Sequence, residues 1–191
     1  MDRSTNRTRS PSFGDYRFGW WCTTNGVSRW PLRVVFNDEI YNHRIWQKEL
    51  AGAGYKFLTR ADTEVLPPAL DYCGVEHKLR GMFAYALYTQ INKCLLMARN
   101  PFGIKPRYVG YAPGLTVFGS EPKTLLTHSR LDRQEDPVAL LGFFTLVAVL
   151  SPRTCWSNIQ ELEHESWLRR TPVGQYQGAL ACDRYLLHRL F

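Results

Sequence analysis

The chain has 191 residues, of which 45% are apolar and 21% are charged, and its formal net charge is +7. This composition is that of a globular protein with enough residues for one domain and a full core, and it excludes disordered, collagen-like and coiled-coil classes. The longest nearly uncharged run, 138–151, is too short to cross a bilayer, so no contact with a membrane is expected.

The positive charge is concentrated near the N-terminus. Residues 1–33 contain six arginines and only two acidic residues, so +4 of the +7 lies there. Glycines and a proline interrupt residues 1–30, which carry no sustained period, and we expect residues 1–32 to form a divergent basic leader. A basic segment also suits nucleic acid, but only the charge supports that interpretation.

Two strands and a helix are predicted in the next part of the chain. The β-rich run 33–36 indicates a short strand, which the polar residues 37–39 would end in a turn. Asn42 can cap a helix over 43–52, where apolar residues recur at helical spacing. The run 55–59 is typical of a second strand.

A helix over 62–73 is predicted next, with Asp62 as its cap. Pro67 and Pro68 conflict with this helix, because proline is tolerated only in the first turn.

The middle of the chain favours antiparallel pairs of strands. Hairpin-sized gaps separate the predicted strands 82–89 and 93–99, and likewise 107–111 and 115–118. A short helical turn over 120–126 and a buried apolar helix over 137–147 follow, the second with proline at its first position. Strands joined by hairpins, with separate helices, indicate an α+β fold with antiparallel sheets.

Generic catalytic motifs are missing from the sequence. There is no dinucleotide-binding or phosphate-binding glycine motif, no G-x-S-x-G and no H-E-x-x-H. The five cysteines are widely spaced without a C-x-x-C pair, so neither a disulfide scaffold nor a metal site is predicted, and reduced thiols in the cytoplasm fit best.

Several longer motifs point to a known family. They are FNDEIYNH (36–43), RADTEV (60–65), LRGMFAYALY (79–88), LLMARNPFGIKPRYV (95–109) and FGSEPKTLL (118–126). In order and spacing they resemble the glutaminase domain of glutamine-hydrolysing asparagine synthetases, which are class II glutamine amidotransferases. A weaker likeness continues through 136–170.

The resemblance implies a fold and a reaction. The fold is the N-terminal-nucleophile hydrolase architecture, a four-layer αββα sandwich of two mainly antiparallel sheets, here incomplete. In the family an N-terminal cysteine attacks the side-chain amide of glutamine and releases ammonia, which a second domain uses to make asparagine. ATP and Mg²⁺ belong to that second domain, so no cofactor is expected for this chain.

The resemblance also assigns site residues. Asn37 matches the asparagine whose amide helps to form the oxyanion hole, and Asp38 stands where the family has the glycine that supplies a backbone N–H. Both are therefore candidate catalytic and substrate-binding residues. Glu39 matches a residue lining the glutamine site, and Asp62 matches the carboxylate that pairs with the α-amino group of glutamine. Without the resemblance, Asp62 is interpreted as a helix cap.

Two departures from the family pattern bear on activity. The chain begins Met1-Asp2-Arg3 rather than Cys-Gly-Ile, and Cys22 is internal and lacks the free amine that the mechanism uses. A carboxylate at Asp38 about 5 Å from a developing oxyanion would cost about 3 kcal/mol, or on the order of a hundredfold in rate. The chain as printed is therefore expected not to hydrolyse glutamine.

Three interpretations remain open from the sequence. The chain is an inactive glutaminase-domain fragment, a module that binds glutamine or a partner such as a separate synthetase subunit, or a basic protein associated with nucleic acid, which is the least expected. The expected organisation is a leader over 1–32, a partial amidotransferase domain over 33–170 and a divergent tail over 171–191.

Overall fold

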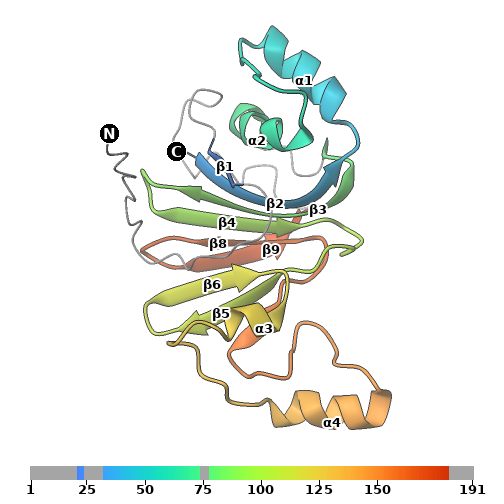
Figure 1. The fold of residues 1–191 in the computed structure, drawn as a ribbon, viewed down its shortest axis with the longest axis vertical. Coiled ribbons are helices and arrows are strands. Elements are labelled where there is room, and N and C mark those ends of the chain that lie inside the picture. The colour runs from blue at the N-terminus through green and yellow to red at the C-terminus, as the bar shows by residue number, and fades with distance from the viewer. Residues whose placement is uncertain (1–20, 24–31, 74–77, 181–191) are drawn as a thin grey trace, which may run out of the picture.

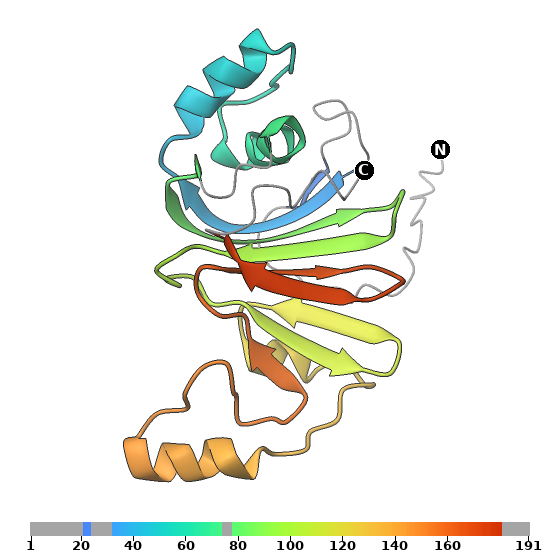
Figure 2. The same ribbon diagram turned by 180° about the vertical axis from the view of Figure 1, so that it is seen from behind.

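The structure is a computed structural model that describes residues 21–23, 32–73 and 78–180. Two antiparallel sheets form its centre (Figures 1 and 2). The larger sheet has the strand order β1-β2-β3-β4-β8-β9 and the smaller has the order β6-β5-β7. The strands are β1 (Trp21–Thr23), β2 (Leu32–Ile40), β3 (Gly81–Thr89), β4 (Cys94–Arg99), β5 (Tyr108–Ala112), β6 (Leu115–Gly119), β7 (Ile159–Glu161), β8 (Ser166–Arg170) and β9 (Gln175–Ala179).

Both faces of the larger sheet are covered. On one face, Phe83 and Leu96 belong to a core cluster that also contains Trp46 and Leu70 of the helices α1 (His43–Gly52) and α2 (Leu66–Cys73). On the other face, Met97 packs in a cluster with residues of the smaller sheet. The α+β prediction with antiparallel sheets and the two predicted hairpins are confirmed.

The strand β2 is longer than predicted. Instead of ending at Phe36, it continues through Asn37, Asp38 and Glu39 to Ile40, which pairs with Gly81 at the start of β3. The predicted turn at 37–39 is therefore wrong, because the ladder with β3 overrides the turn preference of these polar residues. The candidate site residues consequently lie within a strand of the larger sheet.

The predicted strand over 55–59 is absent. The backbone N–H groups of Leu58 and Thr59 donate to the carboxylate of Glu64, at 2.7 and 2.8 Å, rather than to a neighbouring strand. The Thr59 hydroxyl also donates to Glu64, at 2.6 Å. A buried side chain thus satisfies the donors that a ladder would have used.

The predicted helix over 62–73 is divided in two. A 3₁₀ turn, η1 (Asp62–Glu64), precedes α2, which restarts at Leu66. Pro67 and Pro68 therefore lie in the first turn of α2, where a missing N–H costs no helical hydrogen bond. The helix over 43–52 is confirmed as α1, but Asn42 does not cap it, because its side chain binds the backbone of Lys78 and Arg80 instead.

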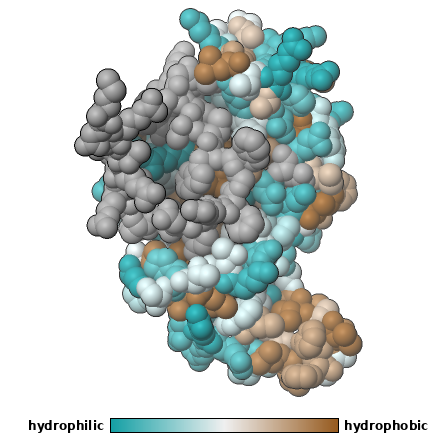
Figure 3. Space-filling model, in the orientation of Figure 1, coloured by the Kyte–Doolittle hydropathy of each residue, from teal (hydrophilic) through white to brown (hydrophobic). Residues whose placement is uncertain are grey.

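The helix predicted over 137–147 forms as α4 (Pro137–Leu146), after the short α3 (Pro122–Leu125). Asp136 caps α4, because its carboxylate accepts from the backbone N–H groups of Val138 and Ala139. The helix is not buried, however: it extends away from the sheets, and apolar side chains gather on its surface (Figures 1 and 3). In the part of the chain that the structure describes, no helix is long and apolar enough to cross a membrane.

Candidate functional site

Asn37 links the two sheets. Its neighbours Val34 and Phe36 belong to the core cluster beneath the helices, so Asn37 faces the opposite side of the larger sheet. There its side-chain Nδ2 donates to the hydroxyl of Ser120 at 3.3 Å. Ser120 directly follows β6, and sequence reasoning did not single it out although it lies in the FGSEPKTLL motif. The contact orients the amide, and Nδ2 has no second partner among the described residues.

β2 pairs with β3 along one of its two edges. The other candidate groups lie on the second edge, which faces away from β3. Tyr41 N donates to Arg80 O, so odd-numbered residues at this end of β2 direct their backbone groups toward β3, and even-numbered residues direct theirs away from it. The partner strand on that second edge, β1, begins at Trp21, opposite Val35. The backbone N–H of Asp38 therefore lies on an edge that no described strand covers.

Asp62 lies on this same edge. Its Oδ2 accepts from the backbone N–H of Ile40 at 2.9 Å, and its Oδ1 accepts from that of Thr63 at 2.8 Å. Asp62 is thus the first residue of η1 rather than its cap, and it joins η1 to the end of β2. Oδ1 also accepts from the Thr63 hydroxyl at 3.4 Å, whereas Oδ2 accepts only from Ile40 among the described residues, so its second acceptor site suits an ammonium group.

The spacing of the Asp38 and Ile40 N–H groups along this edge is close to the length of extended glutamine. The N–H groups of Asp38 and Ile40 are two residues apart, about 7 Å along a strand. The Asp38 N–H, which can bind an oxygen, and the Asp62 carboxylate on the Ile40 N–H, which can bind an ammonium group, are therefore separated by about 7 Å. In extended glutamine the amide oxygen lies about 6 Å from the α-nitrogen, because five bonds join them.

Glu39 is less closely tied to these groups. Its side chain is exposed, and its backbone is paired with Met82 on β3. Gly81 faces the carbonyl of Glu39 so closely that a Cβ at Gly81 would overlap its oxygen. The structure thus gathers Asn37, the Asp38 backbone and Asp62 at one end of β2, and leaves Glu39 at the rim.

Arg107 is a further residue that sequence reasoning missed. Its side chain is buried, and its Nη2 donates to the carbonyl of Ala84 at 2.7 Å. Ala84 is the residue of β3 that pairs with Asn37. Burial lowers the pKa of Arg107 to about 10, so the group keeps its charge at neutral pH. Its place in the motif LLMARNPFGIKPRYV, directly before β5, was the only signal in the sequence.

The two thiols that the structure describes lie away from Asn37. Cys94 pairs with Thr89, five residues along β3 from Ala84, which is about 17 Å. Burial raises the pKa of Cys94 to about 11, which disfavours its nucleophilic thiolate. Cys155 lies at the base of α4, where its backbone carbonyl accepts from the backbone N–H of Asp136. The side chains of Cys22 and Cys73 lie outside the described residues.

The fold and the site define a class. Two stacked antiparallel sheets with helical cover are the N-terminal-nucleophile hydrolase architecture of amidotransferases. Among solved structures, glutamine phosphoribosylpyrophosphate amidotransferase from B. subtilis, complexed with ADP and GMP, matches with a TM-score of 0.54 at 19% identity. The match covers 81% of this chain and 30% of that one, and it supports the fold alone.

The family follows from the sequence comparison. The model of the glutamine amidotransferase domain matches residues 27–183, and the chain belongs to this family. Asparagine synthetase [glutamine-hydrolyzing] 1 of Bacillus subtilis is 36% identical over 143 residues, which are 74% of this chain and 22% of the relative. Asparagine synthetase B [glutamine-hydrolyzing] of Escherichia coli is 40% identical over 96 residues, 49% of this chain and 17% of the relative. The chain thus spans less than a quarter of either relative.

Proposed function

We propose that this chain carries the glutamine-binding side of a glutaminase site, which serves asparagine synthesis by supplying ammonia from glutamine. The observation that carries the proposal is the arrangement at the end of β2. The Asp38 N–H and the Asp62 carboxylate share one edge at the spacing of glutamine's amide oxygen and α-nitrogen. The names of the curated relatives support the same substrate and the same product.

Each group has a stated task. The second N–H of the Asn37 amide and the backbone N–H of Asp38 stabilise negative charge on the amide oxygen, and one such donor is typically worth about 3 kcal/mol in the transition state. The carboxylate of Asp62 binds the α-ammonium group. The proposed partner is a synthetase domain or subunit that uses the ammonia with ATP and Mg²⁺, and the proposed compartment is the cytoplasm.

We further propose that the 191-residue chain binds glutamine without hydrolysing it. Two observations support this. The described thiols lie far from Asn37 or are protonated, and Asp38 carries a carboxylate on the residue that supplies a donor N–H. A negative side chain there opposes the charge that develops on the amide oxygen.

Calorimetry with glutamine tests the binding. Asp62→Asn keeps an acceptor for the Ile40 N–H but not also for the Thr63 N–H, and it removes the charge. We therefore expect the affinity for glutamine to fall at least tenfold with only a small decrease in melting temperature. The matched control is Asp132→Asn, an exposed aspartate at the other end of the molecule, which should leave the affinity unchanged. Equal affinity in wild type and Asp62→Asn would contradict the site, and no heat with wild type would contradict glutamine binding.

An ammonia-release assay tests the lack of turnover. We expect the rate with wild type to equal that with Cys22→Ala and that without protein. A rate above both would show that the chain is an active glutaminase.

A further inference from the structure

Arg107 is a buried cation for which the described residues supply no counter-ion. Its side chain is 1% exposed, and its guanidinium carbon lies 5.6 Å from the centroid of the Phe118 ring. Among the residues that the structure describes, no carboxylate contacts it, and its Nε has no hydrogen-bond partner. A buried unpaired charge is costly, so a charge of this kind often marks a function.

Two paths place this cation beside Asn37. The first runs through Ala84, whose carbonyl accepts from Arg107 and which pairs with Asn37 across the β2–β3 ladder. The second runs through β6: Phe118 lies under the guanidinium, and Ser120, two residues on, accepts from the Asn37 amide. Directly paired residues lie about 5 Å apart. The guanidinium lies one hydrogen bond of 2.7 Å beyond the Ala84 carbonyl, so we take its distance from the oxygen site of Asn37 as on the order of 8 Å.

We propose that Arg107 is a specificity-determining residue of the glutamine site, whose positive charge raises the affinity for a negatively charged oxygen relative to a neutral amide oxygen. The inference rests on the proposed function. The anionic oxygen is the γ-carboxylate of glutamate, the product of glutamine hydrolysis, and the same field stabilises the oxyanion that forms on the amide.

The size of the effect follows from Coulomb's law. Two unit charges about 8 Å apart, at an effective dielectric constant near 20, attract strongly enough to change a dissociation constant about 30-fold. Because screening by solvent and salt weakens part of this interaction, we expect a change of about tenfold.

The test compares glutamate with glutamine. Dissociation constants for both are measured by calorimetry at pH 7 and low salt for wild type, Arg107→Met and Arg107→Lys. Arg107→Met keeps the length and removes the charge, so the affinity for glutamate should fall about tenfold relative to that for glutamine. Arg107→Lys keeps the charge and should restore most of the ratio. A purely structural role would weaken both ligands alike.

The matched control is Arg169→Met. Arg169 stacks on the exposed Tyr176 at 4.7 Å, away from the site, and its replacement makes the same change in net charge. The inference would be overturned if the ratio of the affinities for glutamate and glutamine in Arg107→Met stayed within twofold of the wild-type ratio. It would also be overturned if Arg169→Met changed this ratio equally. If melting curves show Arg107→Met to be unfolded, Arg107→Gln takes its place with the same expected ratio.

The outcomes separate the two proposals. If wild type binds glutamine but the ratio of the affinities for glutamate and glutamine does not change in Arg107→Met, the role of Arg107 is contradicted and the glutamine site is not. Binding of neither ligand by wild type overturns both.

Discussion

Arg99 on β4 and Glu161 on β7 form an ion pair that joins the larger sheet to the smaller one, with 2.7 Å between Nη1 and Oε1. The same guanidinium donates to the carbonyls of Gly103, Lys105 and Leu162. One side chain therefore holds the loop after β4 and the segment after β7. The ion pair is largely shielded from water, so it differs from an ordinary surface pair.

Replacing Arg99 should strongly destabilise the fold. Arg99→Met leaves the Glu161 carboxylate and three carbonyls without their donor, and breaking a buried pair in this way costs about 3–5 kcal/mol. Glu161→Gln keeps a hydrogen-bond acceptor and should cost only about 1–2 kcal/mol. Urea unfolding measures both, with Lys123→Ala as control. Lys123 pairs with Glu121 on the surface, and its loss should cost less than about 1 kcal/mol. Equal losses in all three variants would contradict the stated role of Arg99.

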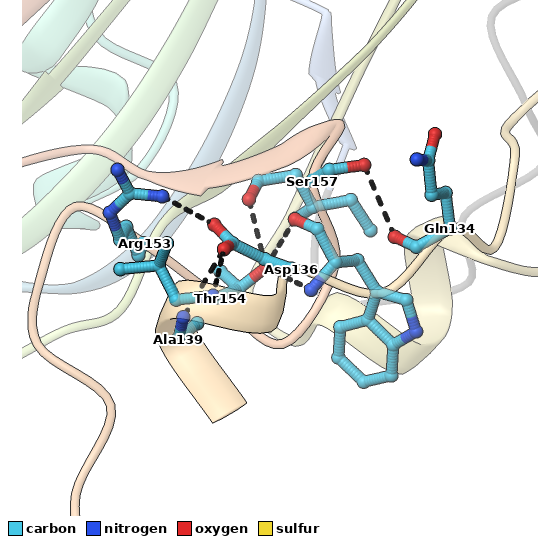
Figure 4. A network of polar contacts seen from close by, with 9 residues as sticks. Gln134, Asp136, Ala139, Arg153, Thr154 and Ser157 are labelled. Carbon is cyan, nitrogen blue, oxygen red and sulfur yellow. Dashed lines mark hydrogen bonds and ion pairs between the residues drawn. The ribbon is translucent and has the colours of Figure 1, made fainter. Parts of the chain in front are cut away.

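The stability should depend on the ionisation of Asp136. The N–H of Ala139, then the pairing with Arg153 at 2.7 Å and the N–H of Val138, hold the pKa of Asp136 below its usual 3.8 (Figure 4). The stabilisation is therefore fully present above about pH 4, the pKa of the unfolded chain, and is lost as the pH falls through the lower pKa of the folded chain. The melting temperature of wild type should exceed that of Asp136→Asn at pH 6, and the difference should shrink toward pH 3.

The control for Asp136 is Asp132→Asn. The carboxylate of Asp132 has no hydrogen-bond partner among the described residues, so this variant should follow wild type at every pH. A gap between wild type and Asp136→Asn that stays constant from pH 6 to pH 3 would contradict the assigned role.

The sequence predicted best what local periodicity and turns determine. The hairpins β3–β4 and β5–β6, the helix α1 and the start of α4 at Pro137 are all local features, and the sequence predicts all of them. Elements that depend on distant partners were missed. The strand β8 pairs with β4, some 70 residues earlier, and nothing in its own residues indicates that partner.

The candidate site shows the same difference between local features and features that depend on distant residues. Asn37 and Asp62 were found through their motifs, but their surroundings arise only in three dimensions. The bond to Ser120 spans 83 residues, and the bond from Ile40 to Asp62 replaces the expected cap. The charge of Arg107 was visible in the sequence, whereas its burial and its place beside Ala84 were not.

Cys94 should be unreactive in the folded protein. With its pKa raised to about 11 by burial, about one molecule in a thousand carries the thiolate at pH 8. We expect iodoacetamide at pH 8 to label Cys155, which is partly exposed, and to leave Cys94 unlabelled until urea is added. Mass spectrometry of the peptides measures both sites. Labelling of Cys94 at the rate of Cys155 without urea would contradict the burial of β4.

The apolar surface of α4 should drive self-association. Phe144 is 80% exposed and lies among exposed Val138, Leu141, Leu146 and Val147, a cluster of the kind that lowers solubility. Phe144→Glu should raise the concentration at which light scattering first detects aggregates. It should change the free energy of unfolding by less than about 0.5 kcal/mol, because the side chain buries little area in the folded state. The matched control is Phe102→Glu, because Phe102 is 84% exposed on a loop outside this cluster. If Phe102→Glu improves solubility as much as Phe144→Glu, net charge rather than the surface of α4 governs association.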